Sequence, residues 1–386
     1  MRIVPLVPLA GALLVSVGCA DGGSDSPPGG HSGGHSGGAV DNEEEGAPGP
    51  RSVGEPEVLA TGLDVPWGMD FLPDGAAVVT ERDSARLLRV EPDGSTVELT
   101  AVDDAEPEGE AGLLGVAVSP EFVSDAMLYL YYTTDEDNRV VRMTYEPNAP
   151  GEDNAELGEP EVVLSGIPRD TADNGGQLAF GPDGMLYAGT GDAGEPELAQ
   201  DTDALSGKVL RMTPEGEPVQ NNPFDNHVYS YGHRNVQGLA WDDDELYAAE
   251  FGPDGADEIN RIAAGENYGW PEVTGVANRE EFTDPVMAWT EADGATPAGG
   301  AVAGGTLWSA ALHGEAIWGV PLAGLNGAAA EAEELGAEAK FVGEYGRLRA
   351  VVPTPERDAL WVTTSNQDGH GEPGQDDDRI LRVPLD

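Results

Sequence analysis

The chain has 386 residues, and its 72 acidic side chains against 19 lysines and arginines give a formal net charge of −53. Such a surface repels phosphate groups, which argues against binding of the protein body to nucleic acid or to anionic lipid. Apolar residues make up 39% of the chain, and the 54 glycines and 30 prolines are typical of dense turns in a folded protein.

Residues 1–19 predict a lipoprotein-type signal peptide. The segment "MRIVPLVPLAGALLVSVGC" has one arginine, an apolar run too short to span a bilayer, and then small residues before the chain's single cysteine. "SVGC" resembles a bacterial lipobox, although Ser16 stands where an aliphatic residue is usual. We therefore expect Cys19 to carry a lipid that anchors the protein outside the cytoplasm, with plain secretion as the alternative.

Residues 20–52 follow as a tether rich in glycine, serine, proline and acidic residues. Stretches such as "DGGSDSPPGGHSGGHSGG" and "DNEEEGAPGP" contain almost no apolar side chains and cannot form a core. We predict a flexible segment here and a single folded domain over residues 53–386.

Six similar units occupy this domain, each with two or three short β-rich runs joined by turns. In the third unit, "NGGQLAFGPDGMLYAGTGDAG", the Asp183-Gly184 pair after Pro182 predicts a tight turn between two strands. A spacing of roughly 45 to 65 residues suits four-stranded blades with insertions. We predict an all-β fold, a six-bladed β-propeller of four-stranded blades. A β-sandwich or a solenoid is the alternative, but a closed ring leaves fewer exposed sheet edges.

Cationic and oxygen-bearing groups stand at the ends of these units, where propeller loops converge. Arg234 and Asn235 lie in "YSYGHRNVQG", while Arg347 and Arg349, two residues apart, share one face of a strand in "YGRLRAV". Three guanidinium groups in one pocket would bind a small polyanion. "EFGPDG", by contrast, is either an ordinary turn or a source of oxygen ligands for calcium.

Taken together, these segments resemble the glucose/sorbosone dehydrogenases, the soluble aldose sugar dehydrogenases that use pyrroloquinoline quinone (PQQ). The resemblance runs from about Gly62 to Pro384, through "VPWGMDFLPDG", "EAGLLGVAVSPEF", "NGGQLAFGPDG", "YGHRNVQGLAW", "GPDGADEINRI", "NYGWP" and "GRLR". Each motif is modest alone, but their number and order are specific. The family is a six-bladed propeller, in agreement with the repeats.

The resemblance implies how a cofactor would be held. The quinone carries three carboxylates, and an Arg-Asn pair and an Arg-x-Arg pair hold it in the family; Arg234, Asn235, Arg347 and Arg349 match these positions. A calcium ion bound by carbonyls at positions matching Gly252 and Pro253 would polarise the quinone.

Two positions depart from the family pattern. His313, in "AALHG", stands where the family has a lysine that contacts the cofactor. Asp173, in "DNGG", replaces the histidine of "HNGG", which is the family's catalytic base. The resemblance implies that Asp192 orients the base and that Glu110 faces the sugar. Asp173 either acts as an altered base, with its pKa raised by burial and by Asp192, or caps a turn in a protein that has lost catalysis.

These residues lead to three hypotheses about function. The first is a PQQ- and calcium-dependent enzyme that oxidises the anomeric hydroxyl of an aldose sugar to a lactone and passes electrons to an external acceptor. The second is a calcium-dependent lactonase, which needs a metal held by side chains and has no use for three arginines. The third is a non-catalytic binding propeller at the cell surface, which the change at Asp173 favours. His233, beside Arg234, is a substitute candidate for the base.

Overall fold

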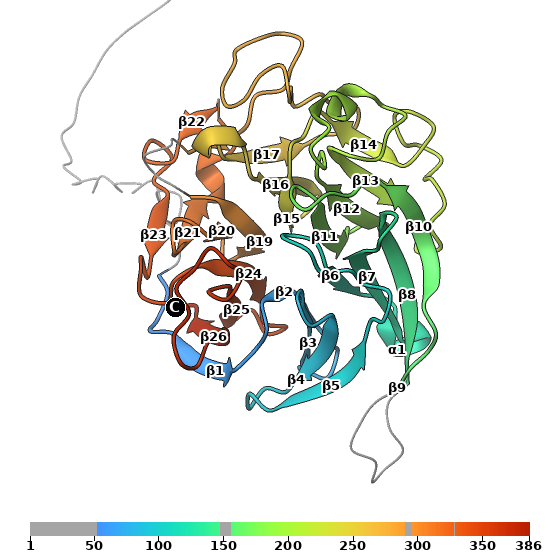
Figure 1. Cartoon of the computed structure of the whole chain (residues 1–386). Coiled ribbons are helices and arrows are strands. Elements are labelled where there is room, and N and C mark those ends of the chain that lie inside the picture. Colours follow the sequence, from blue (N-terminus) through green and yellow to red (C-terminus); the bar gives the residue numbers. More distant parts are fainter. Residues whose placement is uncertain (1–51, 147–155, 290–294, 328) are drawn as a thin grey trace, which may run out of the picture. The chain divides into compact units, whose positions relative to one another are not determined.

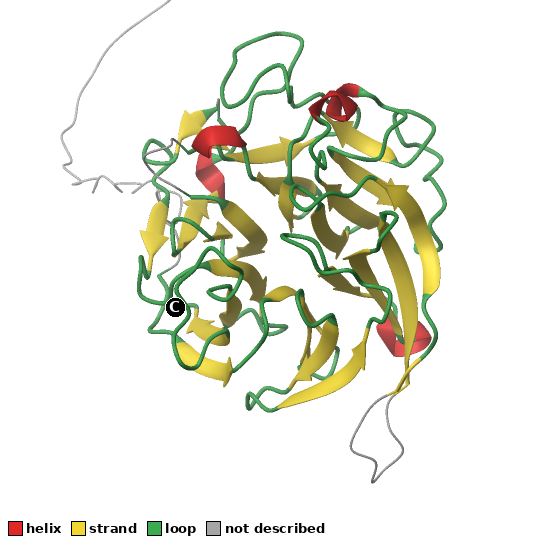
Figure 2. Cartoon of the chain, in the orientation of Figure 1, coloured by secondary structure: helices red, strands yellow, loops and turns green. Residues whose placement is uncertain are grey.

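The computed structural model describes residues 52–146, 156–289, 295–327 and 329–386, and shows short strands joined by loops and turns, with very little helix (Figures 1 and 2). These residues belong to one compact unit, Gly46–Asp386. The predicted signal peptide, the lipidation site Cys19 and all of the predicted tether except Ser52 lie outside the described residues. Within the described part, no helix is long and apolar enough to cross a membrane.

Six sheets surround a central axis, which confirms the predicted propeller (Figure 1). The first three blades, from the inner to the outer strand, are β2 (Pro66–Phe71), β3 (Ala77–Glu81), β4 (Arg86–Val90) and β5 (Thr96–Ala101); β6 (Leu113–Val118), β7 (Met127–Thr133), β8 (Asn138–Glu146) and β10 (Glu161–Ile167); and β11 (Gly175–Phe180), β12 (Leu186–Thr190), β13 (Lys208–Met212) and β14 (Val228–Tyr231).

The other three blades follow the same plan. They are β15 (Val236–Asp242), β16 (Glu245–Glu250), β17 (Glu258–Ile262) and β18 (Met287–Ala288); β19 (Pro297–Ala303), β20 (Thr306–Ala311), β21 (Ala316–Pro321) and β23 (Glu338–Lys340); and β24 (Leu348–Pro353), β25 (Ala359–Thr364), β26 (Arg379–Pro384) and β1 (Glu57–Thr61). Two sheets carry a fifth strand, β9 (Glu156–Leu157) beside β8 and β22 (Ala330–Glu331) beside β18. The prediction of four strands per blade is therefore correct for the other four sheets.

Helices are short and lie between strands. They are α1 (Phe122–Asp125) and the 3-10 helices η1 (Pro196–Gln200), η2 (Pro253–Gly255) and η3 (Leu322–Gly324). The predicted turn at Asp183-Gly184 is confirmed: β11 and β12 pair across it, and Gly184 adopts a φ of 73°.

The ring closes through both ends of the folded chain. β1, from the start of the domain, pairs antiparallel with β26, from its end, with Glu57 opposite Arg382. The inner strand β24 of this last blade also packs against β2 of the first. Between these blades Phe71 and Trp361 make an edge-to-face contact with ring centroids 5.0 Å apart. Closure therefore combines backbone pairing with aromatic packing.

Glycine is the third residue of four inner strands, where neighbouring backbones approach closely: Gly68, Gly115, Gly238 and Gly299. A Cβ atom on Gly115 would lie 2.1 Å from the carbonyl oxygen of Gly176, and one on Gly299 would lie 2.7 Å from that of Arg349. Both distances are far below van der Waals contact, so only glycine fits. The repeat glycines thus allow the inner strands to crowd around the axis.

We expect Gly299→Ala to lower the free energy of unfolding by about 1–3 kcal/mol, the usual cost of overpacking. Gly300→Ala is the matched control, because a Cβ there would meet its nearest atom, on Ala240, at 3.8 Å. Chemical denaturation of both variants measures the difference. Equal stabilities would show that this close approach does not limit the packing of the inner strands.

Candidate active site

The predicted site residues meet at one end of the blades. Glu110, Asp173, Asn235 and Arg347 stand just before the inner strands β6, β11, β15 and β24. Asp192, Phe251 and His313 stand just after the second strands β12, β16 and β20. Because inner and second strands run antiparallel, the start of one and the end of the other lie at the same edge of each blade.

A cavity of about 320 Å³ lies among these loops, within the usual size of a small-molecule site. The predicted residues Glu110, Asn235, His313 and Arg347 line it. Six further residues that the sequence did not suggest complete the wall: Gln237, Phe251, Thr296, Pro297, Leu312 and His370. Gln237 could have been predicted, because it lies two residues beyond Asn235 and side chains two residues apart in extended chain share a face.

Asp173 is held by the two residues predicted to bind the cofactor. Its Oδ2 accepts a hydrogen bond from Arg234 at 2.8 Å, and its Oδ1 accepts one from Asn235 Nδ2 at 3.0 Å. Its backbone N–H donates to Glu110 at 3.3 Å, and its φ is 53°. Burial raises the pKa of Asp173 to about 6, against the opposing charge of Arg234 and with support from the negative charges of Glu110 and Asp192. The carboxyl group is therefore poised to titrate near neutral pH.

Asp192 acts on Asp173 through charge and backbone rather than through a side-chain hydrogen bond. The indole N–H of Trp270 donates to Asp192 Oδ2 at 2.8 Å, and the N–H of Gly194 donates to Oδ1 at 2.9 Å. The N–H of Ala193 donates to the carbonyl oxygen of Asp173 at 3.0 Å. Asp192 is thus buried and fixed beside Asp173.

Arg347 and Arg349 lie beside different spaces in the site. Arg347 lines the cavity and pairs with Asp368 at 2.9 Å. Arg349 is buried beside a narrower space that Gln237 and Trp67 also line. Its Nη1 donates to Gln237 Oε1 at 3.0 Å, and its guanidinium group lies over the Trp67 ring at 5.2 Å.

The Nε of Arg349 is buried and has no hydrogen-bond partner among the described residues. Burial, followed by the nearby charge of Arg82, lowers the pKa of Arg349 to about 10, so the side chain stays charged at neutral pH. A buried cation with an unsatisfied donor favours an anionic ligand. This feature fits the carboxylates of the quinone.

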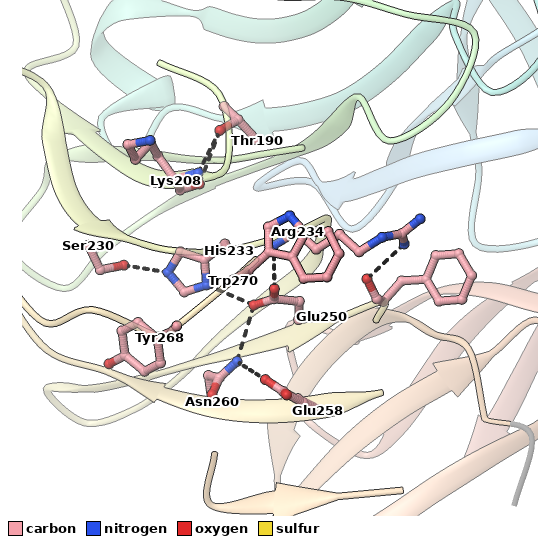
Figure 3. Close-up of polar contacts among 12 residues, drawn as sticks. Thr190, Lys208, Ser230, His233, Arg234, Glu250, Glu258, Asn260, Tyr268 and Trp270 are labelled. Atoms are coloured by element: carbon pink, nitrogen blue, oxygen red, sulfur yellow. Dashed lines mark hydrogen bonds and ion pairs between the residues drawn. The ribbon is translucent and has the colours of Figure 1, made fainter. Parts of the chain in front are cut away.

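A buried polar network holds the loop that carries Arg234 and Asn235 (Figure 3). Glu250 accepts the Arg234 backbone N–H at 2.5 Å, and its Oε2 contacts His233 Nδ1 at 2.7 Å. The other ring nitrogen of His233 contacts Ser230 Oγ at 2.8 Å. His233 is fully buried with both nitrogens engaged, so its position does not support a role as substitute base.

A second buried carboxyl group extends this network. Asn260 Nδ2 donates to Glu250 at 3.1 Å and to Glu258 at 3.2 Å, which links the two acids (Figure 3). Burial, followed by the charge of Glu250, raises the pKa of Glu258 to about 8. Glu258 is therefore mostly protonated at neutral pH, which limits repulsion between the two acids.

Gly252 and Pro253 follow Phe251, which lines the cavity, but they face a separate space of about 10 Å³ beside Arg234 and Trp270. The Pro253 carbonyl accepts the N–H of Ala256 at 2.9 Å. Over the described ranges, no three His, Cys, Asp or Glu side chains are grouped to hold a metal ion. Calcium at this point would therefore depend on backbone carbonyl oxygens, as the resemblance implies, and on the bound cofactor.

Known proteins share this architecture. The model of the glucose/sorbosone dehydrogenase family matches residues 63–380. Aldose sugar dehydrogenase YliI of Escherichia coli is 33% identical over 251 residues, which cover 61% of this chain and 68% of YliI. Quinoprotein glucose dehydrogenase B of Acinetobacter calcoaceticus is 33% identical over 256 residues, 57% of this chain and 52% of that protein.

Solved structures agree with these sequence matches. The PQQ-bound form of an aldose sugar dehydrogenase from Streptomyces coelicolor is 50% identical, with a TM-score of 0.82 over 88% of this chain and 100% of that one. The apo-form of the soluble Escherichia coli aldose sugar dehydrogenase is 26% identical, with a TM-score of 0.71 over 87% of this chain and 100% of that one. The chain therefore belongs to the glucose/sorbosone dehydrogenase family.

Proposed function

We propose that the protein is a PQQ- and calcium-dependent dehydrogenase that oxidises the anomeric hydroxyl of an aldose sugar to a lactone and passes the electrons to an external acceptor. The observation that carries this proposal is the donor set around the cavity. Asn235, Gln237 and Arg347 line it, and the buried Arg349 donates a hydrogen bond to Gln237. The Streptomyces coelicolor relative, at 50% identity, binds PQQ.

Each donor has a role toward the cofactor. Arg347 and Arg349 would bind carboxylates of the quinone, and Arg234 with Asn235 would donate further hydrogen bonds to it. His313, which lines the cavity, would contact the cofactor where the family has lysine. The carbonyl oxygens of Gly252 and Pro253 would bind calcium. When bound, the quinone supplies a hydride acceptor that calcium polarises as a Lewis acid.

The acidic residues would act on the sugar. Asp173, with a pKa of about 6, would take the proton of the anomeric hydroxyl on a carboxylate oxygen as the hydride leaves the anomeric carbon. Asp192 would raise the basicity of Asp173 through its negative charge, and Glu110, which lines the cavity, would bind a sugar hydroxyl.

Reconstitution tests this proposal. Purified protein is titrated with PQQ in the presence and absence of calcium, and a dye-reduction assay then surveys a panel of aldoses. We expect stoichiometric quinone binding and calcium-dependent oxidation of at least one aldose. Quinone binding without any sugar oxidation would favour the non-catalytic propeller, and metal binding without quinone binding would favour the lactonase.

The membrane anchor is a separate proposal that depends on Cys19 and the "SVGC" motif. Cys19→Ser removes the thiol that would carry the lipid, so the protein should move from the membrane fraction to the soluble fraction. Fractionation of cells that express each form measures this change. A wild-type protein that is already soluble would contradict the lipid anchor.

A further inference from the structure

An internal carboxylate, that of Asp173, occupies the pair Arg234 and Asn235. Arg234 gives Nη2 to Asp173 and Nη1 to the carbonyl oxygen of Phe251. Asn235 Oδ1 accepts the Gly175 N–H and Gln237 Nε2, both at 3.0 Å, which fixes the amide so that Nδ2 points to Asp173. The donors that the quinone needs are thus the donors that Asp173 uses.

Besides Arg234, two negatively charged groups of the described residues act on Asp173. Glu110 comes from the loop before β6, and Asp192 follows β12. The side chain of Asp173 is only 14% exposed, so water screens these charges weakly. If Arg234 turned to another anion, Asp173 would keep the unfavourable neighbours and lose the favourable one.

We propose that Asp173 is an internal competitor for the cofactor: its carboxylate occupies Arg234 and Asn235 until a cofactor anion takes this pair and releases Asp173 toward the substrate. The inference rests on the proposed function. Asp173 stands where the resembled family has histidine, and a neutral imidazole would not compete with the cofactor for a guanidinium group. The aspartate therefore affects cofactor affinity as well as proton transfer.

Proton linkage follows from this exchange. Release from Arg234 raises the pKa of Asp173 above its value of about 6 in the ion pair. The loaded protein then binds more protons than the free protein at pH values above about 6. Cofactor affinity should therefore fall as pH rises above about 6, until Asp173 ionises in both forms.

The test is a quinone titration of calcium-loaded protein, followed by absorbance, from about pH 5.5 to about pH 8. Asp173→Asn removes the charge but keeps a hydrogen-bonding side chain, and Asp173→Ala removes both. We expect each variant to bind quinone about 10-fold more tightly than wild type at about pH 7.5 and to lose the decline of affinity with pH. Asp170→Asn is the control, since this exposed acid lies three residues away and its Oδ1 accepts the N–H of Thr171 rather than a hydrogen bond from Arg234 or Asn235.

The outcomes separate the two proposals. Tighter, pH-independent binding in both Asp173 variants, with wild-type behaviour of Asp170→Asn, supports the competitor. Quinone binding that is equal in wild type and in both Asp173 variants across the pH range overturns the competitor and leaves the dehydrogenase proposal intact. A complete lack of quinone binding in wild type and both variants overturns the dehydrogenase proposal, and the competitor with it. Equal tightening in Asp170→Asn would assign the effect to general charge and overturn the specific role of Asp173.

Discussion

Asp173→His should raise the rate of sugar oxidation at neutral pH by about 10-fold or more, within the range of general-base effects. The gain does not come from intrinsic basicity, because the pKa of Asp173 is about 6 and that of an ordinary histidine is about 6.5. It comes from the protonation state of the loaded enzyme: once Arg234 and Asn235 turn from Asp173 to the cofactor, the pKa of Asp173 rises and its carboxyl group holds a proton at neutral pH, whereas an imidazole is mostly the free base there.

The pH profile makes this prediction specific. If release from Arg234 raises the pKa of Asp173 in the loaded enzyme, the wild-type rate should keep rising above neutral pH, whereas the His variant should reach a plateau just above about pH 6.5. Steady-state rates at saturating quinone and calcium compare the two. Asp173→Asn is the control and should lose activity by about 100-fold.

A contrary result would also be informative. If the Asn variant matched wild type and the His variant gained nothing, Asp173 would have no role in proton transfer. His233 would not replace it, because it is fully buried between Ser230 and Glu250. The base would then be sought among the residues that line the cavity, where Glu110, His313 and His370 carry carboxyl or imidazole groups.

The blade pattern was predictable because inner and second strands are apolar and buried, and because a glycine recurs where inner strands meet. Outer strands gave no such signal. β5, with the sequence "TVELTA", has only one buried residue, and β10 has two among seven. Strands at the rim of a blade face solvent on much of their surface, so their composition resembles that of loops.

The sequence predicted which residues belong to the site but not which of them contact one another. Glu110, Asn235, His313 and Arg347 line one cavity, as expected from their places at repeat ends. The ion pair between Asp173 and Arg234 joins residues 61 positions apart on different blades, and no local pattern records it. Other residues that line the cavity, such as Thr296, Pro297 and Leu312, have side chains with no distinctive chemistry. Their place in the cavity could be recognised only from the folded propeller.

Arg349→Met should weaken quinone binding by about 1.5–3 kcal/mol, the scale of a charge-assisted hydrogen bond, without destabilising the cofactor-free protein. Arg349 is buried, its Nε has no partner among the described residues, and its neighbours include the like charges of Arg82 and Arg347. Methionine keeps the contact with Trp67 while removing a cation that is costly to bury.

A binding residue and a structural residue are distinguished by comparing quinone affinity with protein stability: loss of a binding residue lowers only the affinity. Arg349→Lys keeps the charge but loses the planar fork, so it should recover only part of the affinity. Arg382→Ala is the matched control, because Arg382 pairs with the exposed Asp358 on the outer part of its blade and should leave quinone affinity unchanged. Quinone titrations give the affinities, and thermal unfolding of the cofactor-free proteins gives the stabilities. If Arg349→Met bound quinone like wild type but unfolded more easily, Arg349 would be a structural residue of the inner strands, and the cofactor carboxylates would depend on Arg347 and Arg234 alone.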